Sequence, residues 1–219
     1  MHISREEFLA QQAEKNNSTY EGPYVGFLKI ENGGEAVVRF AYDSPDQMDI
    51  IAFHLVTEPG KPEYQGKRYN CQRDSFSSPI SDCPLCESKV PMKQKVFLKL
   101  IEYTRDENDN IVATPKIWER STKWVTKISQ LFEEYGNVSD YVFKIKRTGS
   151  GLETTYSDPM LANPTIYNAD NYPKDFSAFD DYKIIGGIIN DTLPGEEDTK
   201  TEEPRVEVPK TTTPRRVTY

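Results

Sequence analysis

The chain has 219 residues, a formal net charge of −8, two histidines and three cysteines. No apolar run is long enough to cross a membrane, and the N-terminal residues lack the hydrophobic stretch of a signal peptide, which argues against membrane and secreted proteins. An odd number of cysteines favours metal ligation in a reducing compartment over a disulfide framework. We therefore expect a cytoplasmic protein with no membrane segment.

Four parts are predicted along the chain. Residues 1–20 form an N-terminal arm or short helix, and residues 21–157 form a β-rich core. Residues 158–189 are interrupted by prolines but carry enough large apolar side chains to pack against the core. Residues 190–219 are rich in Pro, Thr, Glu and Lys, which predicts a disordered acidic tail with a basic end.

Segments of alternating apolar and polar residues predict the strands of the core. They are 24–30, 35–42, 49–56, 95–103, 111–120, 141–147 and 152–157. The turn at Asn32-Gly33-Gly34 predicts that the first two form a hairpin. Residues 121–135 predict a helix that ends at Gly136, because apolar side chains recur at helical spacing. Short strands with one intervening helix predict an all-β fold, a five-stranded Greek-key barrel of the OB type.

A metal-binding motif occupies residues 54–86. Sixteen residues separate His54 from Cys71, eleven separate Cys71 from Cys83, and two separate Cys83 from Cys86. A tetrahedral Zn²⁺ site needs four nitrogen or sulfur ligands, and a C-x-x-C turn supplies two of them from one loop. A closed Cys₃His set leaves no position for a reacting water. We therefore expect one structural zinc ion in a subdomain at about residues 54–90.

Other interpretations of the cysteines fit the sequence less well. They could be buried apolar residues, or Cys83 and Cys86 could form a redox pair. A thioredoxin-like pair opens a helix in a βαβ unit, and no such unit surrounds this one. A zinc deaminase needs H-x-E followed by P-C-x-x-C, whereas Val56 stands at the glutamate position and Asp82 precedes Cys83.

Two of the predicted strands place an aromatic residue between two cations on one face. The residues concerned are Lys95, Phe97 and Lys99 in the first strand and Lys116, Trp118 and Arg120 in the second. Bases stack on aromatic rings while cations contact phosphates, which is what binding of single strands without sequence readout requires. The alternative is that Phe97 or Trp118 is covered by another part of the chain. The same pattern in two strands favours a nucleic-acid surface.

Further candidates for nucleic-acid contacts lie in the predicted strands 141–147 and 152–157 and beside the metal motif. They are Lys144, Lys146, Arg147, Tyr156, Arg68 and Arg73. Each basic cluster taken alone also fits a solvated surface, and Tyr156 could equally be a stacking residue or a core residue. The core has nearly balanced charge, so a local basic groove remains compatible with the acidic total.

The order of these motifs resembles a known family. A histidine is followed by "NCQRDSFSSPISDCPLCES", a lysine–aromatic strand, a tryptophan strand leading into a helix, and "FKIKRTGSGLETTYS". This order is similar to that of the bacteriophage single-stranded DNA-binding proteins related to the helix-destabilising protein of T-even phages. The resemblance covers roughly residues 21–157. It implies an OB-fold whose inserted zinc is held by His54, Cys71, Cys83 and Cys86, with the aromatic and basic strand faces lining a DNA cleft.

The resemblance also implies a function. We expect a non-enzymatic protein, monomeric without DNA, that coats single-stranded DNA during phage replication, recombination or repair in the bacterial cytoplasm. Its acidic C-terminal tail is expected to contact phage replication or recombination proteins. Residues 1–20 lack the basic cluster that drives cooperative binding in the T-even proteins. The alternative is a zinc-ribbon scaffold for protein–protein interaction without nucleic-acid binding.

Overall fold

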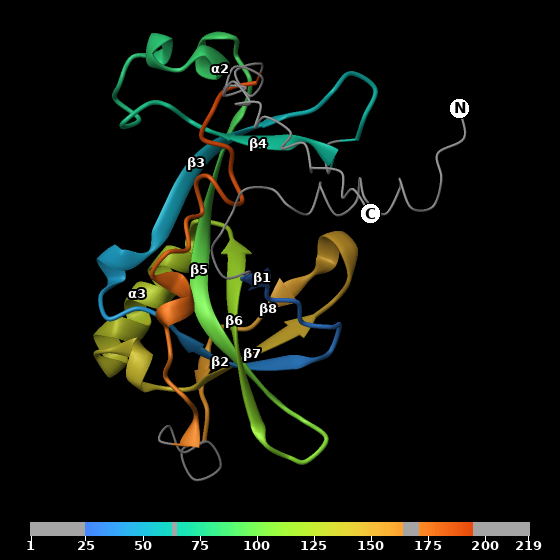
Figure 1. The fold of residues 1–219 in the computed structure, drawn as a ribbon, viewed down its shortest axis with the longest axis vertical. Helices are drawn as coiled ribbons and strands as arrows, with labels where there is room; N and C mark the ends of the chain where they lie inside the picture. Colours follow the sequence, from blue (N-terminus) through green and yellow to red (C-terminus); the bar gives the residue numbers. More distant parts are fainter. Residues whose placement is uncertain (1–24, 63–64, 164–170, 195–219) are drawn as a thin grey trace, which may run out of the picture.

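The fold is β-rich, with short helices and a mixed sheet. The computed structural model describes residues 25–62, 65–163 and 171–194. Their nine strands are joined in one hydrogen-bonded network, whose main path runs in the order β1-β6-β5-β2-β7-β8 (Figure 1). Along this path only β1 and β6 pair in parallel. The predicted arm at 1–20 and most of the predicted tail lie outside the described residues.

Four longer strands form the centre of the sheet, and they pair with one another in antiparallel orientation. They are β2 (Glu35–Phe40), β5 (Met92–Arg105), β6 (Ile111–Arg120) and β7 (Phe143–Thr148). β5 pairs with β6 along most of its length, and β2 lies between β5 and β7. Side chains alternate between the two faces of a strand. On one face, Val38, Phe40, Leu98 and Phe143 are buried in the main hydrophobic core.

Three two-residue strands complete the path or branch from it. They are β1 (Gly26–Phe27), β8 (Thr155–Tyr156) and β9 (Met160–Leu161). β8 pairs with β7 in antiparallel orientation, so the glycines at 149 and 151 lie in the connection of a hairpin. The hairpin predicted between 24–30 and 35–42 is wrong, because β1 pairs with β6 whereas β2 pairs with β5 and β7. The turn itself forms, and Gly33 N donates to Arg147 O at 3.0 Å.

An inserted unit lies between β2 and β5 and projects from the sheet (Figure 1). It contains β3 (Asp49–Val56), β4 (Lys67–Asn70) and the one-turn helix α2 (Pro84–Glu87). β3 pairs with β4 and also with the first half of β5, from Met92 to Phe97. The second half of β5 pairs with β2. One strand therefore belongs to both the insertion and the rest of the sheet.

Helix α3 (Lys123–Tyr135) connects β6 to β7 and covers the main core. It buries Trp124, Ile128 and Leu131 and ends at Gly136, whose φ of 75° favours glycine. The helix was predicted within two residues of these limits. The remaining helical turns are η1 (Pro45–Gln47), η3 (Ile80–Asp82), η4 (Val138–Asp140), η5 (Gly151–Glu153) and η7 (Ser177–Phe179).

The C-terminal segment covers the second face of β5. Phe179, Tyr182, Ile184 and Ile189 are buried against Phe97 in a second core cluster. The segment reaches the insertion, where Asn190 N donates to Arg68 O at 2.9 Å. Both faces of β5 are thus buried. In the part of the chain described here, no helix has the length and apolar character needed to span a membrane.

Candidate metal centre and nucleic-acid interface

Four predicted ligands converge in the insertion. His54 lies on β3, Cys71 directly follows β4, and Cys83 and Cys86 lie at the start of α2 and within it. Their ligand atoms all lie within 4.8 Å of one another. Pro84 at the first position of α2 fixes a backbone angle suited to the tight turn between the two cysteines. The four side chains form a cluster that can bind one metal ion.

The spacing of the ligand atoms matches a tetrahedral site. His54 Nε2 lies 3.6 Å from Cys83 Sγ and 3.4 Å from Cys86 Sγ, and Cys71 Sγ lies 3.7 Å from Cys86 Sγ. A tetrahedron with bonds of about 2.3 Å to sulfur and 2.0 Å to nitrogen has edges of about 3.5–3.8 Å. The donor set and these three distances therefore fit a four-coordinate metal, and the remaining pairs of ligand atoms lie within 4.8 Å.

The chain also orients the histidine ring for ligation. His54 is fully buried, and its Nδ1 lies 3.0 Å from the carbonyl oxygen of Val90. A carbonyl accepts a hydrogen bond, so Nδ1 carries the proton and Nε2 presents its lone pair to the cysteines. Metal-binding histidines typically donate a hydrogen bond from the ring nitrogen that does not bind the metal.

The thiols differ in their electrostatic surroundings. Burial alone would raise the pKa of Cys83, but N–H donors of Gln72, Cys86 and Leu85 and the Cys86 side chain lower it below its ordinary value. Burial raises the pKa of Cys86 to about 11, and the neighbouring thiols Cys71 and Cys83 contribute to the increase. A bound metal cation opposes the increase in the pKa of Cys86, because it stabilises the thiolates that ligate it.

The predicted DNA-binding face on β5 and β6 is wrong in its register. Trp118 lies opposite Leu98, and Phe97 lies opposite Glu119, so the two aromatic residues occupy different faces of the sheet. Phe97 is 0% exposed beneath the C-terminal segment, and Trp118 is 1% exposed in the main core. Neither ring presents a free stacking surface. The alternative that another part of the chain covers Phe97 is the one observed.

Several predicted cations pair with nearby carboxylates. The pairs and their N···O distances are Lys99–Asp49 (3.0 Å), Lys144–Glu35 (2.7 Å), Arg68–Glu119 (2.8 Å) and Lys95–Glu119 (4.0 Å). Arg73 instead donates to the carbonyl oxygens of Phe76 and Ser78 and so holds the loop before the C-x-x-C turn. Lys146 is exposed on β7, and Lys116 is half-buried opposite Leu100. These residues do not form one continuous basic face.

A cleft of about 470 Å³ nevertheless brings part of the predicted set together. It is lined by Phe27, Leu28, Lys95, Trp118, Glu119, Arg120, Ser121 and Trp124. Phe27 is 41% exposed, so its ring is available to a ligand. Lys95 and Arg120 supply positive charge to the same cleft. Phe27 was not predicted as a site residue, because a cation flanks it at alternating spacing on one side only, Lys29, with Val25 on the other.

Arg120 is held between two aromatic rings beside this cleft. Its guanidinium carbon lies 4.7 Å from the ring centre of Trp118 and 4.0 Å from that of Tyr156. Tyr156 is half-buried and lies directly opposite Arg147 in the β7–β8 pair. Tyr156 therefore packs against the main core and holds a cation in place, whereas base stacking by Tyr156 stays a prediction.

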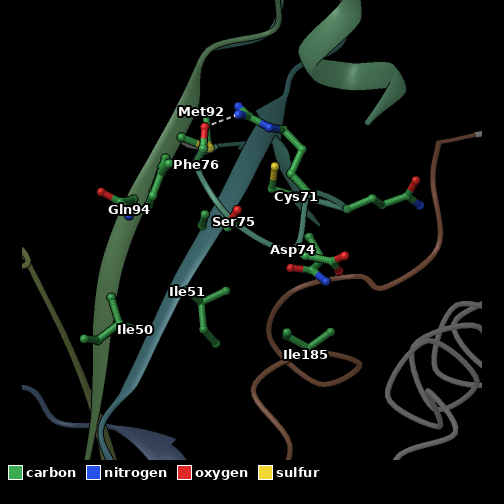
Figure 2. A pocket seen from close by; sticks show the side chains of 13 residues that line it. Ile50, Ile51, Cys71, Asp74, Ser75, Phe76, Met92, Gln94 and Ile185 are labelled. Carbon is green, nitrogen blue, oxygen red and sulfur yellow. Dashed lines mark hydrogen bonds between the residues drawn. The ribbon is translucent and has the colours of Figure 1, made fainter. Parts of the chain in front are cut away.

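A second cavity of about 430 Å³ lies where the metal-binding insertion meets the sheet (Figure 2). Its walls come from β3, β5, the loop after β4 and the C-terminal segment. Phe76 of the loop is 60% exposed and Ile50 of β3 is 48% exposed. Neither residue was predicted to line a site, because single apolar residues in loops and strands carry no distinctive pattern.

No protein-family model and no curated protein matches this chain. The geometry of the two clefts and of the metal cluster therefore carries the functional argument.

Proposed function

We propose that this chain is a zinc-stabilised protein that binds single-stranded DNA without reading its sequence. The observation that carries the proposal is the cleft in which the exposed ring of Phe27 lies with Lys95 and Arg120. An accessible ring can stack on any base, and flanking cations attract the phosphates. In this proposal the ring of Phe27 stacks on a base, as was predicted for Phe97 and Trp118.

The proposed fold is of the OB type. β2, β5 and β6 form an antiparallel meander, α3 follows it, and β7 returns to pair with β2. OB-folds are partly open five-stranded Greek-key barrels that bind oligonucleotides along their strands and loops. The metal-binding unit is an insertion between the first two strands of this meander. The proposed domain limits are 21–157 for the OB core, with the metal-binding insertion at about 54–90.

The proposed metal is Zn²⁺, one ion per chain. Three thiolates and one imidazole at tetrahedral spacing are the ligand set that structural zinc prefers. When bound, the ion supplies charge and cross-linking but no open coordination position. His54 fixes β3, Cys71 fixes the end of β4, and Cys83 and Cys86 fix α2, so the ligands tie the insertion together.

The biological setting is proposed from the resemblance described above. It comprises a non-enzymatic, monomeric protein that coats DNA during phage replication, recombination or repair in the bacterial cytoplasm. The proposed contacts of the acidic tail with other replication or recombination proteins involve residues that lie mostly outside the described ranges.

Titration of a fluorescent oligo-dT with the full chain, at two salt concentrations, tests the proposal. We expect saturable binding that weakens with salt, and much weaker binding of a duplex of equal length. Phe27→Ala should weaken single-strand binding by about 1–3 kcal/mol, the usual contribution of one base stack. Val112→Ala is the matched control, because Val112 is equally exposed at 41% but lies at the other end of β6. Equal binding of all three proteins contradicts the assigned cleft.

The zinc-ribbon scaffold is the second candidate, and one observation favours it. Phe76, Ile80 and Ile50 are all exposed on the metal-binding insertion or beside it. Exposed apolar groups in proximity can mark a protein interaction site. Under this candidate the wild-type chain shows no oligo-dT binding at low salt, whereas the metal content is unchanged.

A further inference from the structure

Three buried N–H donors lack an acceptor within the described residues. They are Nε1 of Trp118, Nε of Arg120 and Nε of Arg147. A buried polar group without a partner is uncommon in folded proteins and calls for a physical explanation, such as a bound ion. The only other atom of this kind in the described ranges is Asp49 Oδ2, and it forms an ion pair with Lys99 at 3.0 Å. The three donors differ from it because their side chains form no ion pair within the described residues.

The three donors belong to one cluster. Arg120 lies over the rings of Trp118 and Tyr156, and Tyr156 faces Arg147 across the β7–β8 pair. Arg147 is held in place by Nη1, which donates to the carbonyl oxygen of Ile30 at 2.6 Å. Trp118 and Arg120 line the cleft that contains Phe27. Two members of the cluster therefore line the proposed DNA-binding cleft, and Arg147 is connected to them through Tyr156.

The two arginines of the cluster carry positive charge that no ion pair of the described residues neutralises. Within residues 25–62, 65–163 and 171–194, neither Arg120 nor Arg147 forms an ion pair with a carboxylate. Glu119 is adjacent to Arg120 in sequence, but its carboxylate pairs with Arg68 at 2.8 Å and lies 4.0 Å from Lys95. Burial lowers the pKa of Arg120 and the positive charge of Arg147 acts in the same direction, whereas the hydroxyl of Tyr156 and the carboxylate of Glu119 oppose this decrease. Two guanidinium groups close together and partly removed from water favour an anion beside them.

We propose that Arg120 and Arg147, together with the indole N–H of Trp118, form a subsite for one phosphate group of a single strand. This assignment rests on the proposed function, because it places a phosphodiester in the same cleft where Phe27 receives a base. The phosphate provides the acceptor and the negative charge that the described residues do not. Arginine suits this task, since its planar fork presents two donors to one phosphate.

The first experiment measures how oligo-dT affinity depends on salt. For single strands, log K falls with log salt by about 0.7 for each phosphate neutralised. We expect Arg147→Gln to reduce the slope by about that amount, and Arg120→Gln to do the same. Arg105→Gln is the matched control, because Arg105 pairs with Asp109 at the far end of the β5–β6 hairpin. Its slope should equal that of the wild type.

A second experiment separates the subsite from the proposed function. Inorganic pyrophosphate should raise the melting temperature of the full chain relative to chloride at equal ionic strength. The increase should disappear in Arg147→Gln and persist in Arg105→Gln. This result without any oligo-dT binding supports an anion subsite and overturns the DNA-binding function.

The remaining outcomes overturn the subsite. If the wild type binds oligo-dT but Arg120→Gln and Arg147→Gln keep its slope, and pyrophosphate does not stabilise the chain, the subsite is absent while DNA binding stands. If pyrophosphate stabilises the chain but both variants keep the wild-type slope, the cluster binds free phosphates and not the strand. Near-ultraviolet circular dichroism of each variant establishes that it is folded. If Arg120→Gln does not fold, the comparison of Arg147→Gln with the wild type tests the subsite.

Discussion

Leu98 and Trp118 lie directly opposite each other in the β5–β6 ladder and are both buried in the main core. The indole of Trp118 also contacts Trp124 of α3 and Tyr156 of β8 edge to face, with ring centres 4.5 and 5.4 Å apart. One side chain thus connects the sheet, the helix and the β7–β8 hairpin. Its burial makes Trp118 a structural residue whose outer edge borders the cleft.

Trp118→Ala should therefore destabilise the fold. Removing a buried tryptophan costs about 3–5 kcal/mol, because it loses apolar burial and leaves a cavity. Urea denaturation followed by far-ultraviolet circular dichroism measures the loss. Trp118→Phe keeps most of the apolar volume and should lose clearly less. Unchanged stability of Trp118→Ala would show that the indole is not part of the core.

Chelation or Cys83→Ser should remove the metal and destabilise the insertion first. The binding free energy of a structural metal is part of the folding free energy. Elemental analysis should find one Zn per chain in the wild type, and hydrogen exchange should increase in β3, β4 and α2 more than in β7. His2→Ala is the control, because His2 is the other histidine of the chain. A metal-free protein with the stability of the wild type contradicts the structural site.

Arg39→Met should detach the C-terminal segment. Arg39 is 2% exposed and donates to Tyr103 Oη at 2.9 Å, Ser139 O at 2.8 Å and Tyr172 O at 3.1 Å. Hydrogen bonds to charged groups contribute about 1.5–3 kcal/mol each, so the loss of stability should reach at least about 3 kcal/mol.

Limited proteolysis measures the detachment, and cleavage should appear within residues 171–194 of the Arg39→Met variant. Arg105→Met removes an exposed arginine and should leave the cleavage pattern unchanged. Equal resistance of both variants to the protease would show that Arg39 does not hold the segment.

Acid should weaken the contact between Asp43 and the turn before β7. Hydrogen bonds from Ser139 and Asn137 lower the pKa of Asp43 below its ordinary value. A carboxyl group with a lower pKa in the folded state stabilises the fold above its unfolded pKa of about 3.9. This contribution is lost as the pH falls through the folded pKa.

Asp43→Asn should accordingly melt at a lower temperature than the wild type at pH 7, and the difference should shrink below about pH 4, where the unfolded carboxyl is protonated. Thermal melts across this pH range measure the effect. Glu153→Gln removes one exposed carboxylate elsewhere and monitors the effect of net charge. A difference that is the same at all pH values would contradict the proposed hydrogen bonds to the carboxylate.

The sequence was sufficient to predict the elements with clear boundaries. The strands at 49–56 and 111–120 have the predicted limits, because apolar and β-branched residues are frequent there and polar turn residues flank them. The four metal ligands were found because histidine and cysteine are scarce and closely spaced in this chain. These patterns involve residues close together in the sequence, so they can be recognised without knowledge of tertiary packing.

The faces of β5 could not be predicted in the same way. Alternation shows which residues share a face but not which face is free, and here both are covered. Phe97 contacts the segment at 171–194, which lies more than seventy residues later in the sequence. The strand predicted at 24–30 is shorter in the structure and comprises Gly26–Phe27, because only these two residues pair with β6. Long-range packing of this kind leaves no periodic signal in the sequence.

The sharing of β5 between the insertion and the sheet connects two sites of the molecule. Met92 pairs with His54, and Lys95 lies three residues further along the same strand. From Val96 onward the same strand also pairs with β6, whose Trp118 and Arg120 line the cleft. The metal cluster and the cleft are therefore connected by one continuous hydrogen-bonded strand.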